Sequence, residues 1–323
     1  QINLINHGAL GANVNGGTLI VQPRFTFTND GGSLLAKNGA TASLLAGTYS
    51  AINGGSYRIF DNSGFTLTGV TLSNLTLDVD NTDSILDNNS VSVSTNSTFS
   101  NIVNQAAVTV QNARTLTLSP GDLTNNGTIT LDSTGSNTAI SLSDPADLLV
   151  SIGGTGRILM DSSTERITGT TNHVFQHEAG HTIEGSGNIG TAALHLDNRG
   201  TISANLPGQS LILDDRLGGF PNTGTLQAIN GGILDIKDPL AHQDGLLFVD
   251  SGSAAVSTST ITQSGGTTRV DGNLTTTSMH MTGGVLQGIG NIDSALVANY
   301  CLVSPGNSTG TLSIDSMTQG PGA

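Results

Sequence analysis

Five consecutive residues in the second half of the chain spell a metalloprotease pattern. They are His177, Glu178, Ala179, Gly180 and His181, which match H-E-x-x-H. On a helix, two histidines at this spacing share one face and can bind one Zn²⁺, with the glutamate as general base. The context disfavours a helix, because Gly180 weakens one and Thr182 opens a strand-like stretch. On a strand the two imidazoles would lie about 13 Å apart, too far to share one ion.

The residues beyond the motif also depart from the extended metalloprotease pattern. That pattern requires a glycine and a histidine three and six residues after the second histidine, where this chain has Glu184 and Gly187. We therefore predict a chance match within a turn, with no catalytic or metal-binding role for His177 and His181.

Two acidic clusters are the next candidates for chemistry. The first comprises Asp78, Asp80, Asp83 and Asp87. Their carboxylates are the oxygen ligands that Ca²⁺ prefers. The β-helix calcium repeat G-G-x-G-x-D is missing, however. A solvated acidic face is therefore the favoured interpretation, and structural calcium remains the alternative.

The second cluster is Asp214-Asp215-Arg216, which has the residue types of a general acid/base pair in a carbohydrate-cleaving enzyme. Adjacent residues of a strand point to opposite faces, so the two carboxylates would converge only if a turn bent the chain. We predict a structural role in a turn. Cys301 is the one cysteine of the chain, so no intramolecular disulfide is possible, and it is predicted to be a small buried hydrophobe. The sequence thus predicts no catalytic, cofactor-binding or metal-binding residue.

A short phrase that returns along the chain indicates what positions these residues. Its copies include Asn126 to Ile129, Asn198 to Ile202, Asn222 to Leu226 and Gly310 to Leu312. Asn and Gly tolerate positive φ, and the Thr, Ile and Leu residues that follow alternate between two faces. Each copy therefore predicts a turn followed by the start of a strand. Asparagines at matching turn positions also predict stacked asparagine ladders.

The spacing of the turn glycines predicts the fold. Gly180, Gly200 and Gly224 are separated by 20 and 24 residues, and each interval holds two or three short strands of period two. Helical periodicity is nearly absent; its best candidate, Ala146 to Ile152, is too short. We predict an all-β fold, a single elongated right-handed parallel β-helix of roughly 13–16 irregular coils. Residues 1–323 would form one continuous repeat domain, alone or as a fragment of a longer chain.

Composition excludes several alternatives. Aromatic residues make up 3% of the 323 residues and Trp is missing, which disfavours a propeller or a sandwich. The net charge of −14 disfavours nucleic-acid binding, since an acidic surface repels phosphates. No stretch approaches the ~20 apolar residues of a membrane helix, so we expect no membrane insertion by this segment.

Two stretches carry a family resemblance, one in Thr182 to Gly190 with Leu196 to Ala204, the other in Gly288 to Ile292 with Ser304 to Leu312. They resemble the repeats in passenger domains of bacterial autotransporters and related large secreted surface proteins. The resemblance implies a right-handed β-helix, export to the bacterial surface or the medium, and a role as adhesin, matrix component or fibre. It also implies further repeats and a C-terminal anchor or barrel after such a unit.

These observations lead to an expected function. We expect a secreted or cell-surface structural or adhesive protein without catalysis, whose partners are further copies of itself or surface and matrix glycans. Neither Gln1 to Leu10 nor Met317 to Ala323 resembles a capping helix, so the ends are predicted to stack on other copies in a filament or to continue into further sequence. The alternative is a polysaccharide-active lyase or glycosidase, and a third possibility is a receptor-binding spike.

Overall fold

The computed structural model describes residues 3–79, 89–119, 121–143, 149–169, 173–216, 218–294, 297–306 and 310–319. Over these ranges the chain forms strands and turns, without a helix. Parallel strands stack as a β-solenoid of about 13 turns. The predicted all-β parallel β-helix is therefore confirmed. Leu149 to Ile152, which the sequence offered as the end of a weak helix candidate, lie in a strand.

The chain divides into two compact units, Gln1–Leu159 and Met160–Ala323. The strands that lie in the first unit are β1 (Leu4–Asn6), β2 (Ala9–Ala12), β3 (Thr18–Val21), β4 (Thr26–Asp30), β5 (Ser33–Ala36), β6 (Thr41–Ile52), β7 (Ser56–Ile59), β8 (Gly64–Val79), β9 (Ser90–Val93), β10 (Ser97–Asn104), β11 (Ala107–Gln111), β12 (Thr115–Leu118), β13 (Leu123–Asn125), β14 (Thr128–Asp132), β15 (Thr138–Leu142) and β16 (Leu149–Gly153). β17 (Arg157–Gly169) contains residues of both units.

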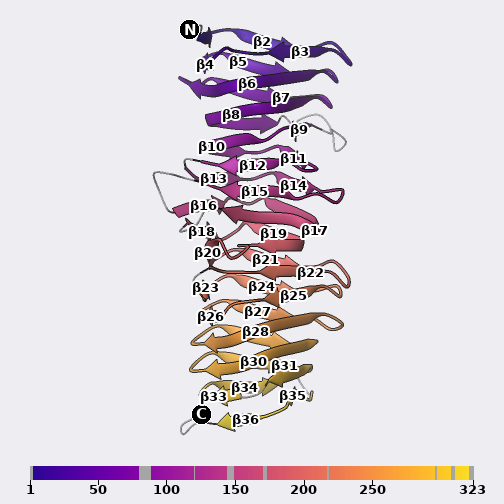
Figure 1. The fold of residues 1–323 in the computed structure, drawn as a ribbon, viewed down its shortest axis with the longest axis vertical. Helices are drawn as coiled ribbons and strands as arrows, with labels where there is room; N and C mark the ends of the chain where they lie inside the picture. The colour runs from indigo at the N-terminus through magenta and orange to yellow at the C-terminus, as the bar shows by residue number, and fades with distance from the viewer. Residues whose placement is uncertain are drawn as a thin grey trace. The chain divides into compact units, whose positions relative to one another are not determined.

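The strands of the second unit follow the same plan (Figure 1). They are β18 (His173–His177), β19 (Thr182–Ile189), β20 (Leu194–Asn198), β21 (Thr201–Ala204), β22 (Ser210–Leu213), β23 (Phe220–Asn222), β24 (Thr225–Ala228), β25 (Ile233–Ile236), β26 (Leu240–His242), β27 (Leu246–Val249), β28 (Ala254–Gln263), β29 (Thr267–Val270), β30 (Asn273–Met281), β31 (Val285–Gly288), β32 (Asn291–Ser294), β33 (Val297–Asn299), β34 (Leu302–Pro305), β35 (Ser313–Ile314) and β36 (Met317–Gln319). The expectation of one continuous domain over 1–323 stays a prediction.

Each coil consists of three short strands, and each strand pairs with its counterpart in the next coil. In the second unit, β22, β23 and β24 make one coil, and they pair in parallel with β25, β26 and β27. Where a corner is nearly straight, two strands merge into one long strand, as in β28 and β30. We call the bend between the second and third strands of a coil the second corner.

The core is a column of inward-facing side chains, one row per strand position. Strand residues alternate between buried and half-buried, as the period of two predicts. The few aromatic residues concentrate inside: Phe27, Tyr49, Tyr57 and Phe65 are buried, and the Phe27 and Tyr49 ring centroids lie 5.9 Å apart. The Tyr49 hydroxyl donates to the Val21 carbonyl at 2.6 Å, so its one polar atom is satisfied in the column.

The recurring phrase, seen at residues 198–201 and 222–225, forms the second corner. The structural reason for its glycine differs from the one that the sequence suggested. Positive φ occurs in the related turn Asn230-Gly231-Gly232, which lies between β24 and β25 and not at the second corner, with 56° at Asn230 and 79° at Gly231. It does not occur at Gly200 or Gly224, so the positive-φ interpretation is wrong there. A Cβ on Gly224 would lie 2.2 Å from the Gly200 carbonyl oxygen. Glycine is required because consecutive coils touch backbone to backbone.

The close backbone contact between coils predicts how much stability is lost when a glycine at the second corner is replaced by alanine. A Cβ on Gly245 would lie 2.1 Å from the Gly224 carbonyl oxygen, whereas a Cβ on Gly8 would meet nothing within 4 Å. We expect Gly245→Ala to lower the free energy of unfolding by about 2 kcal/mol or more, because the coils must separate. Gly8→Ala should change it by less than about 0.5 kcal/mol. Urea denaturation followed by circular dichroism measures both, and equal effects would contradict the close-contact explanation.

Candidate functional site

A buried row of polar side chains runs through the second corner of the second unit. Strand register aligns one residue from each of five coils: His177, Asn198, Asn222, His242 and Gln263. All five are fully buried. We call this row the polar ladder. It confirms the predicted asparagine ladder and extends it with histidine and glutamine.

The ladder is joined by hydrogen bonds from coil to coil. His177 Nδ1 donates to Asn198 Oδ1 at 2.8 Å, and Asn198 Nδ2 donates to Asn222 Oδ1 at 2.6 Å. Asn222 Nδ2 then donates to His242 Nδ1 at 3.0 Å, and His242 Nε2 donates to the Thr267 carbonyl. These contacts use both ring nitrogens of His242 in the neutral tautomer. The first unit has a shorter version, in which Asn104 Nδ2 donates to Asn125 Oδ1 at 2.8 Å.

The metalloprotease-like pattern lies at one end of this ladder. β18 ends at His177 and β19 begins at Thr182, so the residues between them form a turn, as predicted. The expected 13 Å separation is wrong, because the turn folds the second histidine back and places His181 Nδ1 3.0 Å from His177 Nε2. Both nitrogens of His177 are thereby engaged, one by Asn198 and one by His181. The carboxylate of Glu178 contacts Gln176 instead.

Burial also fixes the charge of the two histidines. It lowers the pKa of His177 to about 4, opposed by its hydrogen bonds, and the pKa of His181 to about 3, with the nearby His177 adding to the effect. Both imidazoles are therefore neutral near pH 7. Both rings are held inside the column by hydrogen bonds, His177 to Asn198 and to His181.

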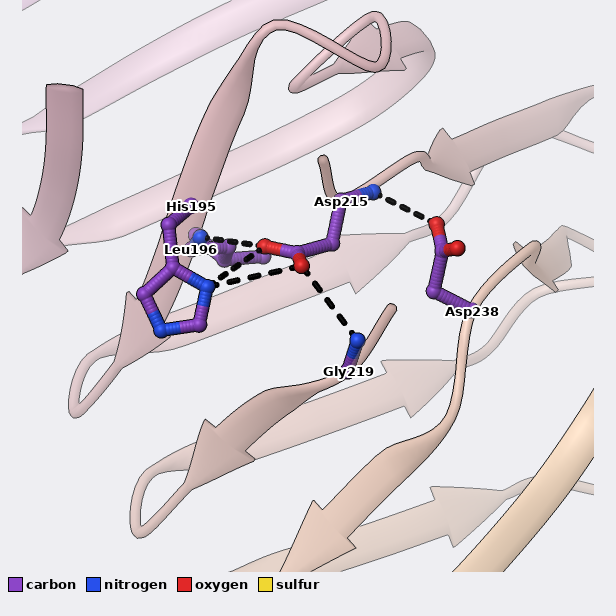
Figure 2. Close-up of polar contacts among 5 residues, drawn as sticks. All are labelled: His195, Leu196, Asp215, Gly219 and Asp238. Atoms are coloured by element: carbon purple, nitrogen blue, oxygen red, sulfur yellow. Dashed lines mark hydrogen bonds and ion pairs between the residues drawn. The ribbon is translucent and has the colours of Figure 1, made fainter. Parts of the chain in front are cut away.

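A second polar cluster surrounds Asp215, at the corner that follows β22 (Figure 2). Its carboxylate is buried and accepts hydrogen bonds from the backbone N–H of Leu196 at 2.7 Å and of Gly219 at 3.4 Å. His195 Nδ1 lies 3.1 Å from Asp215 Oδ1. The Asp215 N–H in turn donates to Asp238 Oδ2 at 2.7 Å. One side chain thus links neighbouring coils through their backbones.

The chemistry of this cluster follows from the donor and acceptor roles. A carboxylate can only accept, so His195 Nδ1 carries the hydrogen and Nε2 is the basic nitrogen. Figure 2 shows this second nitrogen pointing away from Asp215.

Burial raises the pKa of Asp214; the charge of Lys237 lowers this pKa and the charge of Asp215 raises it further. Burial also raises the pKa of Asp238. The sequence singled out Asp215 but missed His195, which lies one coil earlier, 20 residues away.

The other candidates from the sequence are separate from these clusters. Asp78 pairs with Arg58, whose Nε lies 3.0 Å from Asp78 Oδ2, while Asp80, Asp83 and Asp87 lie outside the described residues. Cys301 is half-buried rather than buried, with its Sγ 3.8 Å from the Met281 sulfur. Within the described part of the chain, no group of three or more His, Cys, Asp or Glu side chains is placed to hold a metal ion.

Hydroxyl groups form continuous rows on the outside of the first unit. Strand register aligns one residue from each of six coils: Thr26, Thr48, Thr71, Thr98, Thr117 and Ser141. All six are half-buried and alternate with core residues, so they point outward. A parallel row begins at Thr28, whose Oγ1 lies 3.2 Å from Ser50 Oγ. We call the six-residue row the hydroxyl row.

Fold and site together define the protein as an all-β parallel β-solenoid with a polar ladder at its second corner. Comparison with known proteins adds no narrower class, since no protein-family model, no curated protein and no solved structure matches the chain. None of the described residues belongs to a helix long and apolar enough to cross a membrane.

The buried histidines predict a fall in stability in acid. Below an ordinary pKa of 6.5 the unfolded chain binds protons that the folded chain excludes, so stability is lost as pH falls toward 4. At pH 5 we expect His177 to account for about 2 kcal/mol of this loss. His177→Asn, which places the side chain of the next two ladder positions there, should reduce the difference between urea midpoints at pH 7 and pH 5. The exposed His7→Asn serves as control, and an identical change in both variants would contradict the assignment.

The Asp215 cluster predicts a structural loss. Asp215→Asn replaces an acceptor by an amide that cannot accept from every present donor, and we expect about 2 kcal/mol lower stability. The matched control is Asp197→Asn, whose carboxylate pairs with the partly exposed Arg199 at the surface and should cost less than about 1 kcal/mol. Urea unfolding measures both. Similar losses would show that Asp215 does not link the coils.

Proposed function

We propose that this protein is an extracellular or cell-surface structural and adhesive scaffold, which binds glycan-bearing surfaces through its outer strand faces and performs no catalysis. The observation that carries the proposal is the hydroxyl row, unbroken over six coils of the first unit. Threonine offers a hydroxyl that donates and accepts, next to a methyl group. A row of them matches the alternating hydroxyls and C–H groups of a glycan better than it matches a charged polymer.

The use of the reactive side chains supports a scaffold. His177 and His181 bind each other and Asn198 inside the column. Asp215 holds backbone N–H groups of other segments. These buried histidines and the buried aspartate thus form hydrogen bonds within and between the coils. In this proposal, recognition is carried out by the outer faces. The net charge of −14 favours neutral partners over anionic ones.

Self-association is the second part of the proposal. In the coil formed by β1, β2 and β3, the apolar side chains of Leu4, Ile5 and Ile20 are 43%, 58% and 63% exposed. Parallel strand pairing can continue from such a coil onto another coil of the same kind. A second copy, or further sequence of the same kind, stacked on this coil would continue its parallel strand pairing and cover these residues. Sedimentation velocity of this chain over a concentration series measures stacking between copies.

A polysaccharide-active enzyme is the alternative, and one observation favours it. His195 is oriented by a buried carboxylate and presents a basic Nε2, as a general base does. Against this, both Asp215 oxygens also accept backbone N–H groups, so the carboxylate has a structural task without any substrate.

One assay separates the two functions. We expect the protein to be retained on at least one insoluble neutral polysaccharide from a panel of cellulose, chitin, mannan and β-1,3-glucan, without release of reducing ends or unsaturated products. His195→Asn should leave retention unchanged. Product release that His195→Asn abolishes would establish the enzyme instead, and no retention on any polysaccharide would overturn the adhesive proposal.

A further inference from the structure

A groove of about 610 Å³ opens on the outer face of the second unit. It crosses the third strands of consecutive coils, β24, β27, β29 and β31. Its principal side chains are Thr225, Asp244, Leu246, Phe248, Arg269 and Gln287. The volume lies within the range of about 300–1,000 Å³ that is common for ligand sites.

The second corner shapes one border of this groove. Gly224, Gly245 and Gly266 line it, and each follows the preceding coil so closely that a Cβ would lie within 2.3 Å of a backbone carbonyl oxygen. These residues must therefore be glycine, and the border presents bare backbone. Thr223 and Asp244 belong to the same corner and bring a hydroxyl and a carboxylate to the groove.

Strand register supplies the rest of the groove. Gln227, Phe248, Arg269 and Gln287 occupy one outward row over four coils, and the last three line the groove. The Arg269 guanidinium lies over the Phe248 ring, 5.1 Å from its centroid. It is also held by Asp271, with Nη2 to Oδ2 at 2.6 Å. The aromatic ring and the guanidinium are therefore fixed before any ligand arrives.

This combination selects a class of ligand. A planar guanidinium with free N–H donors, an amide and a carboxylate can bind vicinal hydroxyls, and an aromatic ring packs against sugar C–H groups. The charge of Arg269 is compensated by Asp271, and Asp244 adds a negative charge. An anionic glycan would therefore be repelled, whereas a neutral one would not.

The direction of the groove indicates a chain rather than a single sugar. Consecutive coils repeat at about 4.8 Å, so a polymer lying across the strands meets a new member of the outward row at each step. We propose that this groove is the binding site of the second unit for a neutral glycan chain, with Phe248 as packing surface and Arg269, Asp244 and Gln287 as hydrogen-bonding groups. This inference rests on the adhesive function proposed above.

The test uses the full chain and the neutral polysaccharide on which it is best retained in the panel assay. We expect Phe248→Ala, Arg269→Gln and Asp244→Ala each to weaken retention at least tenfold. Asp244 is exposed, so its variant also reports on binding without a change of packing. The matched control is Arg58→Gln in the first unit, where the guanidinium lies 4.7 Å from the Phe60 centroid and pairs with Asp78. Urea midpoints check that every variant is folded.

The outcomes distinguish a failure of the groove assignment from a failure of the proposed adhesive function. Weaker retention in the three groove variants but not in Arg58→Gln supports the proposal. Unchanged retention in all groove variants overturns the assignment of the groove as the glycan-binding site, while the adhesive function stands. Insoluble polygalacturonate is added to the panel as an anionic polymer, and retention of the unmodified chain on it but on none of the neutral polysaccharides overturns the neutral ligand class. If the unmodified chain is retained on no glycan, the adhesive function and the groove fail together.

Discussion

The structure depends on the contact between consecutive coils at the second corner, where the backbones touch and the interior excludes water. The close contact admits glycine alone at positions such as Gly224 and Gly245. The excluded water leaves every polar group inside the corner to be satisfied by protein. The polar ladder meets this need, since Asn198 and Asn222 bond each other and pass the chain of hydrogen bonds to His177 and His242. Coil spacing and ladder chemistry are two consequences of one packing constraint.

This constraint determines where chemistry is available. A histidine or carboxylate that enters the column becomes part of the stacking, as His181 and Asp215 do. Burial and fixed hydrogen bonds hold these side chains in place. Outward positions carry no such obligation, because solvent satisfies their polar atoms. The same backbone therefore presents a hydroxyl row on the first unit and an aromatic and guanidinium pair at Phe248 and Arg269 on the second.

The groove of the second unit arises from the same corner that stabilises the fold. Bare glycines are needed for coil contact, and they also leave space beside the third strands. Side chains that extend from Phe248, Arg269 and Gln287 fill only part of that space. A repeat of this kind thus forms a groove without any added loop, and the residues of the outward row determine the chemistry of its surface.

The sequence by itself determined the fold class, because alternation of period two and turn glycines 20 and 24 residues apart are local properties of the chain. It also identified the asparagine ladder from matching turn positions. Only the tertiary structure decided which corner residues meet. The His177–His181 contact depends on a turn of four residues, and the His195–Asp215 contact joins residues 20 apart through strand register. Coil lengths vary, and a shift of one residue would reverse which side chains face inward. Partners across coils are therefore set by the accumulated register, which no single segment of the sequence contains.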